Sequence, residues 1–256
     1  MTTLSTHASA RTPRLLAVLA LFAALVLTGC TPSGNTALPA MRVLFIGNSY
    51  TFYNGGLDQV LHGLAPHTET ASATVGGYTL ADHLRDSSTM GKLQEGGWDA
   101  VVIQEQSQGP VWSFSRYLSS ARTLTVKARR LGARPMLLQT WARPDSRGIT
   151  AGALEAAFTK AGKSLQATVI PAGRAFDRSL SLHPQIVLNQ NDGHPTPEGT
   201  YLAGCVAYAT IFQVSPVGNS FTAGLDSQTA HILQQMAETA TLHTPKAATA
   251  SATSAP

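Results

Sequence analysis

The chain has 256 residues, of which 43% are hydrophobic and 12% are charged, and it contains two cysteines. This length and composition fit one globular domain with appended segments and exclude two full-sized domains. The formal net charge is +4. The basic residues are dispersed along the chain, however, so the charge does not favour nucleic acid as a partner.

Residues 1–29 have the features of a targeting segment. Arg11 and Arg14 precede an apolar run at 15–27, which is too short to span a bilayer comfortably. The run ends in Leu-Thr-Gly-Cys at 27–30, which resembles the bacterial lipoprotein signal, in which a peptidase cuts before a cysteine that receives a lipid. The alternative is a secretory peptide or anchor that merely contains a cysteine. Cleavage would remove two arginines and no acidic residue, which leaves a net charge of +2.

A lipid on Cys30 predicts a protein held on the extracytoplasmic side of a bacterial membrane. Cys205 is then the one remaining cysteine, so we expect no intrachain disulfide and place Cys205 in the core. Residues 30–40 are small, polar and proline-containing, and are predicted to form a tether. Residues 244–256 have the same character and are predicted to be disordered, which leaves 41–243 as the folded domain.

Within the domain, short apolar runs alternate with longer segments that have helical spacing. The predicted strands are 42–47, 69–75, 98–104, 133–140 and 167–173, and helical patterns occupy 55–65, 113–130, 149–165 and 201–212. Strand–helix alternation with such apolar strands predicts an α/β fold, a five-stranded parallel sheet between two layers of helices. Ligands of such sheets bind at the carboxyl ends of the strands, so functional residues are expected just after each predicted strand.

Ser49 follows the first predicted strand by two residues, in the stretch Gly-Asn-Ser-Tyr-Thr at 47–51. Glycine and asparagine favour a sharp turn that would expose the serine hydroxyl, although a plain turn serine or helix cap has the same sequence. His194 lies in a loop rich in Gly, Pro, Asn and Asp ahead of the helical segment at 201–212. Its side chain is suited to act as a general base, and the alternative is a histidine on a surface loop. The other seven histidines, His83 among them, are interpreted as solvated or packing residues.

Together these segments resemble the SGNH/GDSL-type hydrolases, whose functional residues lie in four separated blocks. The resemblance covers roughly residues 41–213 and implies a flavodoxin-like three-layer fold. It implies that Ser49 is the nucleophile, with its own amide in the oxyanion hole. Gly77, in Gly-Gly-Tyr-Thr at 76–79, would supply a second oxyanion amide, and His194 would be the base.

Two blocks depart from the family pattern. The third block of the family has an Asn whose side chain donates to the oxyanion, but this chain has Gln-Glu-Gln-Ser at 104–107. Alignment on the end of the predicted strand places Gln106 at the position of that Asn. Gln104 is the alternative donor. In the fourth block the acid stands three residues before the histidine, but position 191 is Asn here. One possibility is that Asp192 reaches the His194 imidazole through an altered turn. The other is that Asn191 or a backbone carbonyl orients the ring.

The resemblance implies a lipid-anchored, monomeric serine hydrolase that cleaves an ester, such as a short acyl ester on a carbohydrate or another envelope polymer. Two alternatives stay open: a glycan-binding lipoprotein that has lost catalysis, and an acyltransferase that uses the same Ser49. No metal and no cofactor are expected, because the sequence has no cluster with ligand spacing beyond Asp192 and His194. Trp141, just past the fourth predicted strand, either walls the pocket or caps the core.

Overall fold

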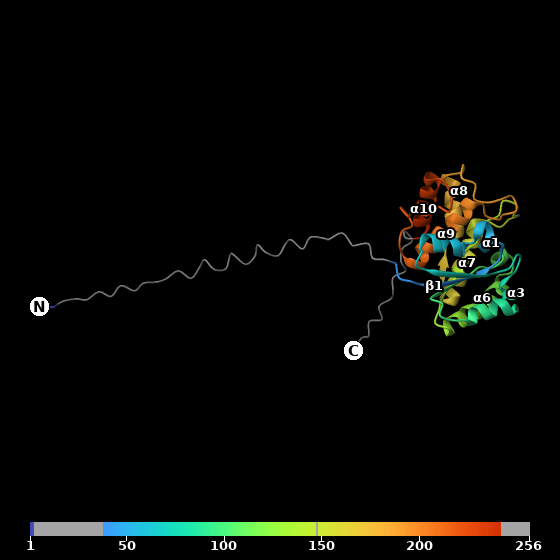
Figure 1. Ribbon diagram of the computed structural model, residues 1–256, viewed down its shortest axis with the longest axis horizontal. Helices are drawn as coiled ribbons and strands as arrows, with labels where there is room; N and C mark the ends of the chain where they lie inside the picture. The colour runs from blue at the N-terminus through green and yellow to red at the C-terminus, as the bar shows by residue number, and fades with distance from the viewer. Residues whose placement is uncertain (3–37, 147, 242–256) are drawn as a thin grey trace. The chain divides into compact units, whose positions relative to one another are not determined.

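The computed structural model describes residues 1–2, 38–146 and 148–241 (Figure 1). The predicted signal segment, Cys30, most of the predicted tether and the predicted tail lie outside the described residues. Leu38 to Thr241 belong to one structural unit. No helix in the described ranges is both long and apolar enough to cross a membrane.

A sheet of five parallel strands forms the centre of the domain, in the order β2-β1-β3-β4-β5. The strands are β1 (Arg42–Gly47), β2 (Glu69–Thr74), β3 (Ala100–Ile103), β4 (Arg134–Leu138) and β5 (Thr168–Ile170). The predicted fold class is confirmed, and each strand lies within its predicted segment. The order reverses between β1 and β3, where Ile46 pairs with Ile103. The segments that follow these two strands therefore leave the sheet side by side.

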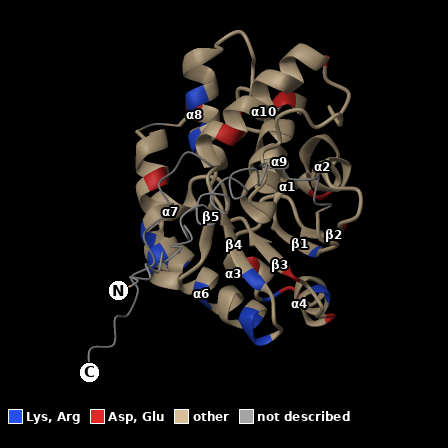
Figure 2. Cartoon of the chain, turned by 90° about the vertical axis from the view of Figure 1, so that its left-hand side faces the viewer, with Lys and Arg blue, Asp and Glu red and all other residues tan. Residues whose placement is uncertain are grey.

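Helices cover both faces of the sheet, and Figure 1 shows α9 and α10 on one side of β1 and α6 on the other. The helices are α1 (Ser49–Phe52), α2 (Leu57–Leu64), α3 (Leu80–His83), α4 (Ser87–Gln94), α5 (Gly109–Trp112), α6 (Phe114–Arg130), α7 (Ala151–Leu165), α8 (Ala172–Leu182), α9 (Pro197–Phe212) and α10 (Ser227–Thr241), with a 3-10 turn η1 (Tyr53–Gly55). The Lys and Arg residues are spread over several of them, including α4, α6, α7 and α8 (Figure 2).

Alternate side chains of β1 divide the core into two clusters. Val43 and Phe45 pack with α2, α8, α9 and α10, whereas Leu44 and Ile46 pack with α3, α4, α6 and α7. This alternation is what a strand covered on both faces requires, because successive side chains point to opposite sides of a sheet. It confirms the three-layer arrangement.

Helix α9 is buried along nearly its whole length and lies against α2. Cys205 of α9 is fully buried, as expected, and burial raises the pKa of its thiol to about 12. At Gly204 the two helices approach so closely that a Cβ atom there would overlap the side chain of Val60. The contact thus requires a residue without a side chain.

Replacing Gly204 with alanine should therefore destabilise the protein. We expect Gly204→Ala to lower the free energy of unfolding by about 1–3 kcal/mol, the usual cost of overpacking a core. Gly91 is the matched control, because it is exposed within α4 and no atom lies near its missing Cβ. Gly91→Ala should raise the free energy of unfolding by about 0.5–1 kcal/mol. Urea denaturation of the two variants tests both signs, and equal effects would contradict the packing argument.

Candidate active site

Ser49 lies at the sharp turn between β1 and α1. β1 ends at Gly47, Asn48 has an extended backbone, and Ser49 is the first residue of α1. The Asn48 side chain caps the helix by accepting a hydrogen bond from the Tyr50 N–H (3.2 Å). A Cβ atom at Gly47 would overlap the side chains of Thr51 and Gln104, so this turn can close only over glycine.

The side chain of Gln104 holds this turn from beneath. Its Oε1 accepts hydrogen bonds from the Asn48 N–H (2.8 Å) and the Thr51 hydroxyl (2.9 Å), and its Nε2 donates to the carbonyl of Glu105. Gln104 is 1% exposed. The alternative assignment of Gln104 as an oxyanion donor does not fit this position, because its amide faces the interior and supports the turn.

His83 supports the same strand end from the other side. It is fully buried, and its Nε2 donates to the carbonyl oxygen of Gly47 (2.8 Å), while Nδ1 contacts the Thr89 hydroxyl (2.9 Å). Burial is the main cause that lowers the pKa of His83. Sequence reasoning had grouped His83 with the solvated or packing histidines, since a histidine in a short polar helix gives no signal of burial.

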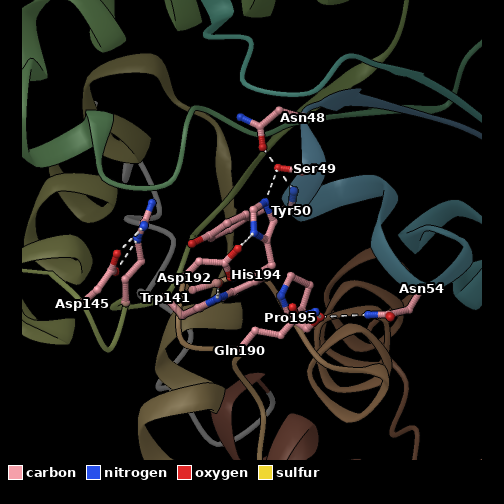
Figure 3. A network of polar contacts seen from close by, with 12 residues as sticks. Asn48, Ser49, Tyr50, Asn54, Trp141, Asp145, Gln190, Asp192, His194 and Pro195 are labelled. Carbon is pink, nitrogen blue, oxygen red and sulfur yellow. Dashed lines mark hydrogen bonds and ion pairs between the residues drawn. The ribbon is translucent and has the colours of Figure 1, made fainter.

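The loop at 189–195 brings His194 to Ser49. His194 Nε2 lies 2.9 Å from Ser49 Oγ, and His194 Nδ1 lies 2.8 Å from Asp192 Oδ2 (Figure 3). Asp192 Oδ1 also accepts from the His194 backbone N–H (3.1 Å). Gly193 has a φ of +83°, a left-handed conformation that glycine adopts readily. This turn allows the carboxylate of Asp192, two residues before His194, to reach the imidazole ring.

Of the two candidate orienting residues, the structure therefore brings Asp192 to the imidazole. Asn191 is exposed, and its side chain contacts no ring nitrogen of His194 within the described part of the chain. A carboxylate only accepts hydrogen bonds, so Nδ1 carries the proton and Nε2 is free to accept from the Ser49 hydroxyl. Hydrogen bonds from the His194 ring and backbone lower the pKa of Asp192, and Arg143 lowers it further. The acid is thus held as a carboxylate.

Aromatic rings fix the position of the imidazole. The Tyr53 ring stacks on His194 at 4.3 Å between ring centroids, and Tyr50 approaches the same ring edge-on at 5.6 Å. Trp141 stacks on Tyr50, and its Nε1 donates to the carbonyl of Gly193 (3.0 Å). Trp141 is 1% exposed, so it belongs to the core and holds the histidine loop rather than walling a pocket.

Asn54 of η1 ties the histidine loop to the segment that follows the serine helix. Asn54 Nδ2 donates to the carbonyl of Pro195 (3.0 Å) and to the Thr200 hydroxyl (2.8 Å), as Figure 3 shows for Pro195. The first bond joins the segment after the serine helix to the loop, and the second joins it to α9. The serine and histidine segments are thus fastened to each other outside the Ser49–His194 contact itself.

A cavity of about 210 Å³ opens beside Ser49. It is lined by Asn48, Ser49, Tyr50, Gly77, Gln106, Ser107, Arg143 and His194. The structure therefore brings Gly77 and Gln106 to the same cavity as the serine and histidine. The Ser49 N–H is left without an acceptor by the described residues. Gln106 Nε2 donates to the Ser107 hydroxyl (3.0 Å), which leaves its second N–H for another acceptor.

Arg143 is a cavity residue that sequence reasoning missed. Its guanidinium forms two hydrogen bonds with Asp145, at 2.8 and 2.6 Å, so its charge is largely neutralised. Arg143 follows the end of β4 by five residues. The expectation that ligand sites lie just after parallel strands, which pointed to Ser49, would also have pointed to Arg143. No group of three His, Cys, Asp or Glu side chains within residues 38–146 and 148–241 is arranged to hold a metal ion.

The buried His83 should make stability depend on pH. Because its pKa is lower in the folded protein than the ordinary value of 6.5, the unfolded chain binds the proton more readily. The free energy of unfolding should therefore fall as pH drops from 7 to 5. His83→Gln should weaken that dependence, whereas the exposed His231→Gln should retain it. Urea denaturation at pH 7 and at pH 5 measures the change in the free energy of unfolding for the wild type and the two variants. The same change in all three proteins would refute this role of His83.

Solved structures of other proteins share the fold of this chain. Neither the family models nor the curated protein sequences give a match to the chain. Among solved structures, a candidate SGNH hydrolase from Slackia heliotrinireducens is 30% identical, with a TM-score of 0.59 over 68% of this chain and 100% of the other. A DUF4886 family protein from Bacteroides uniformis is 17% identical, with a TM-score of 0.62 over 79% and 95%. An acetyl xylan esterase is 15% identical, with a TM-score of 0.52 over 67% and 100%, and so shares the fold. The chain belongs to the SGNH hydrolase superfamily.

Proposed function

We propose that this protein is a serine esterase in which Ser49 is the nucleophile, His194 the general base and Asp192 the residue that orients His194. The observation that carries the proposal is the continuous hydrogen-bonded chain from Ser49 Oγ through the imidazole to the Asp192 carboxylate, beside a cavity that also contains Gly77 and Gln106. Superfamily membership supports it. A plain turn serine would not need a histidine held on two sides by aromatic rings.

In the first half-reaction, His194 Nε2 takes the proton of the Ser49 hydroxyl as Oγ attacks the ester carbonyl carbon. The carbonyl π electrons move to oxygen, and the tetrahedral intermediate then expels the alcohol, which receives the proton from His194. Asp192 keeps Nδ1 protonated and stabilises the imidazolium formed between these steps. Water, deprotonated by the same histidine, attacks the acyl-enzyme and releases the acid and Ser49.

The developing oxyanion would be held by the backbone amides of Ser49 and Gly77 and by the second Nε2–H of Gln106. All three residues line the cavity next to Oγ. Glutamine supplies the same N–H donor as the asparagine of the family pattern on a longer side chain. The protein would thus keep the family chemistry despite the altered third block.

For the substrate, we propose a short acyl ester on a carbohydrate or another envelope polymer, and for the location, the outer face of a bacterial membrane through a lipid on Cys30. The location rests on the sequence of residues 15–30 alone. The cavity of about 210 Å³ beside Ser49 supports a small acyl group over a long chain.

Loss of either member of the serine–histidine pair should abolish turnover. We expect the full-length protein to hydrolyse p-nitrophenyl acetate and to be labelled by a fluorophosphonate probe. Ser49→Ala should lose labelling, and both Ser49→Ala and His194→Ala should lose roughly 10⁴- to 10⁶-fold in kcat. A folded wild-type protein that is neither labelled nor active would instead favour a binding protein. A labelled protein that hydrolyses the ester slowly, but releases p-nitrophenol faster when a sugar is added as acyl acceptor, would favour the transferase.

Asp192 and Asn191 provide a matched pair for the orienting role. Asp192→Ala should lower kcat at least about tenfold, towards the roughly ten-thousand-fold loss seen when a triad histidine is wrongly oriented. Asn191→Ala should remain within about twofold of wild type, because its side chain does not contact the ring. Steady-state kinetics on p-nitrophenyl acetate decides this, and a larger loss for Asn191→Ala would reverse the assignment.

A further inference from the structure

The side chain of Glu105 lies between the two segments that carry Gly77 and Gln106. Its Oε1 accepts a hydrogen bond from the Gln106 backbone N–H (2.7 Å), and both of its carboxylate oxygens lie 3.4 Å from the backbone nitrogen of Leu80. Leu80 is the first residue of α3 and follows Gly77 by three positions, so its N–H has no acceptor within its own helix. One carboxylate thus joins the start of α3 to the loop after β3.

Two further hydrogen bonds attach the Gly77 segment to the end of β1. The Asn48 side chain donates from Nδ2 to the carbonyl of Tyr78 (2.8 Å), and His83 Nε2 donates to the carbonyl of Gly47 (2.8 Å). Among the hydrogen bonds of the described residues, those that the carboxylate accepts are the only ones that join this segment to the loop after β3. The spacing between the two segments therefore depends on that carboxylate.

Packing alone does not account for an acid at this position. Glu105 is 4% exposed and has no ion pair within 4.0 Å among the residues that the structure describes. Burial raises the pKa of Glu105, while the bonds from the Gln106 and Leu80 N–H groups lower it; at longer range, Asp82 raises it and Arg116 lowers it. An apolar side chain of the same size would fill the space without the cost of burying a carboxyl group. The acid is thus explained by the N–H groups that it holds.

We propose that Glu105 is a positioning residue of the esterase site, which sets the distance between the Gly77 N–H and the Gln106 side chain on either side of the oxyanion. This inference rests on the proposed esterase function. Glu105 does not line the cavity beside Ser49, so it acts through the two segments and not by touching the ester. Oxyanion donors work only at hydrogen-bond distance from the oxygen, and a displacement of about 1 Å can cost about a hundredfold in rate.

Two variants of similar size separate the hydrogen bonds of Glu105 from its packing. Glu105→Met fills the space without an acceptor oxygen. It should lower kcat for p-nitrophenyl acetate about 10- to 100-fold and leave KM within about twofold, because the oxyanion forms only after the substrate has bound. Glu105→Gln keeps one oxygen for the Gln106 N–H and should retain at least about a third of the wild-type kcat. A wild-type kcat in Glu105→Met, or the same loss in both variants, would overturn the proposal.

Asp226 provides a matched control at another helix start. Its carboxylate also accepts a backbone hydrogen bond, from the Thr229 N–H (2.9 Å) in α10, but it belongs to neither oxyanion segment. Asp226→Ala should therefore leave kcat within about twofold of the wild-type value. A loss of kcat equal to that of Glu105→Met would show a general effect of removing a helix cap, and would also overturn the proposal.

Hydrogen exchange separates this proposal from the proposed function, because it needs no turnover. The amides of Leu80 and Gln106 should exchange slowly in the wild-type protein. In Glu105→Met both should exchange at least about tenfold faster, whereas Glu105→Gln should keep the Gln106 amide protected. That result would support the positioning role of Glu105 even if the wild-type protein hydrolysed no ester, which would overturn the proposed function alone. Unchanged exchange of both amides in folded Glu105→Met would overturn the role of Glu105.

Discussion

The hydrogen bonds between Gln104 and the turn after β1 are the constraint on which the rest of the site depends. One amide oxygen receives both the Asn48 N–H and the Thr51 hydroxyl, and so joins the ends of two neighbouring strands. This bond pair lies where the strand order of the sheet reverses, the position at which parallel sheets bind ligands. Because the amide is buried, losing either bond would leave an unpaired polar group, and the turn is held firmly in one geometry.

The other residues of the site lie on two loops, and hydrogen bonds attach each loop to neighbouring elements. The 189–195 loop depends on Trp141 and Asn54, and the loop after β3 is held by the Thr140 hydroxyl, which donates to the Ser107 carbonyl (2.5 Å). Loops carry the chemistry, but buried side chains from neighbouring elements set their positions. The positions of the site residues are therefore set by contacts with the elements around the edge of the sheet.

The parallel sheet and the strand-end serine were predictable because buried strands give continuous apolar runs and ligand sites follow them. Other features were not. Gln104 and Gln106 are both polar residues after one strand, and only the structure shows which amide faces inwards. The choice between Asp192 and Asn191 depended on the left-handed backbone of Gly193, which sequence spacing does not reveal. His83 ends the short helix α3, whose packing is decided by distant segments, so its sequence neighbours carried no sign of burial.

The contact between Ser49 and His194 also joins residues 145 positions apart in the chain. A ribosome makes the amino-terminal end first, so the serine and its supporting strand exist long before the loop that carries the histidine. Long-range contacts of this kind form late, after the cost of closing a long loop has been met. In an unfinished chain the Ser49 hydroxyl would therefore have no histidine beside it, and the proposed reaction could begin only once nearly the whole domain had been made and folded.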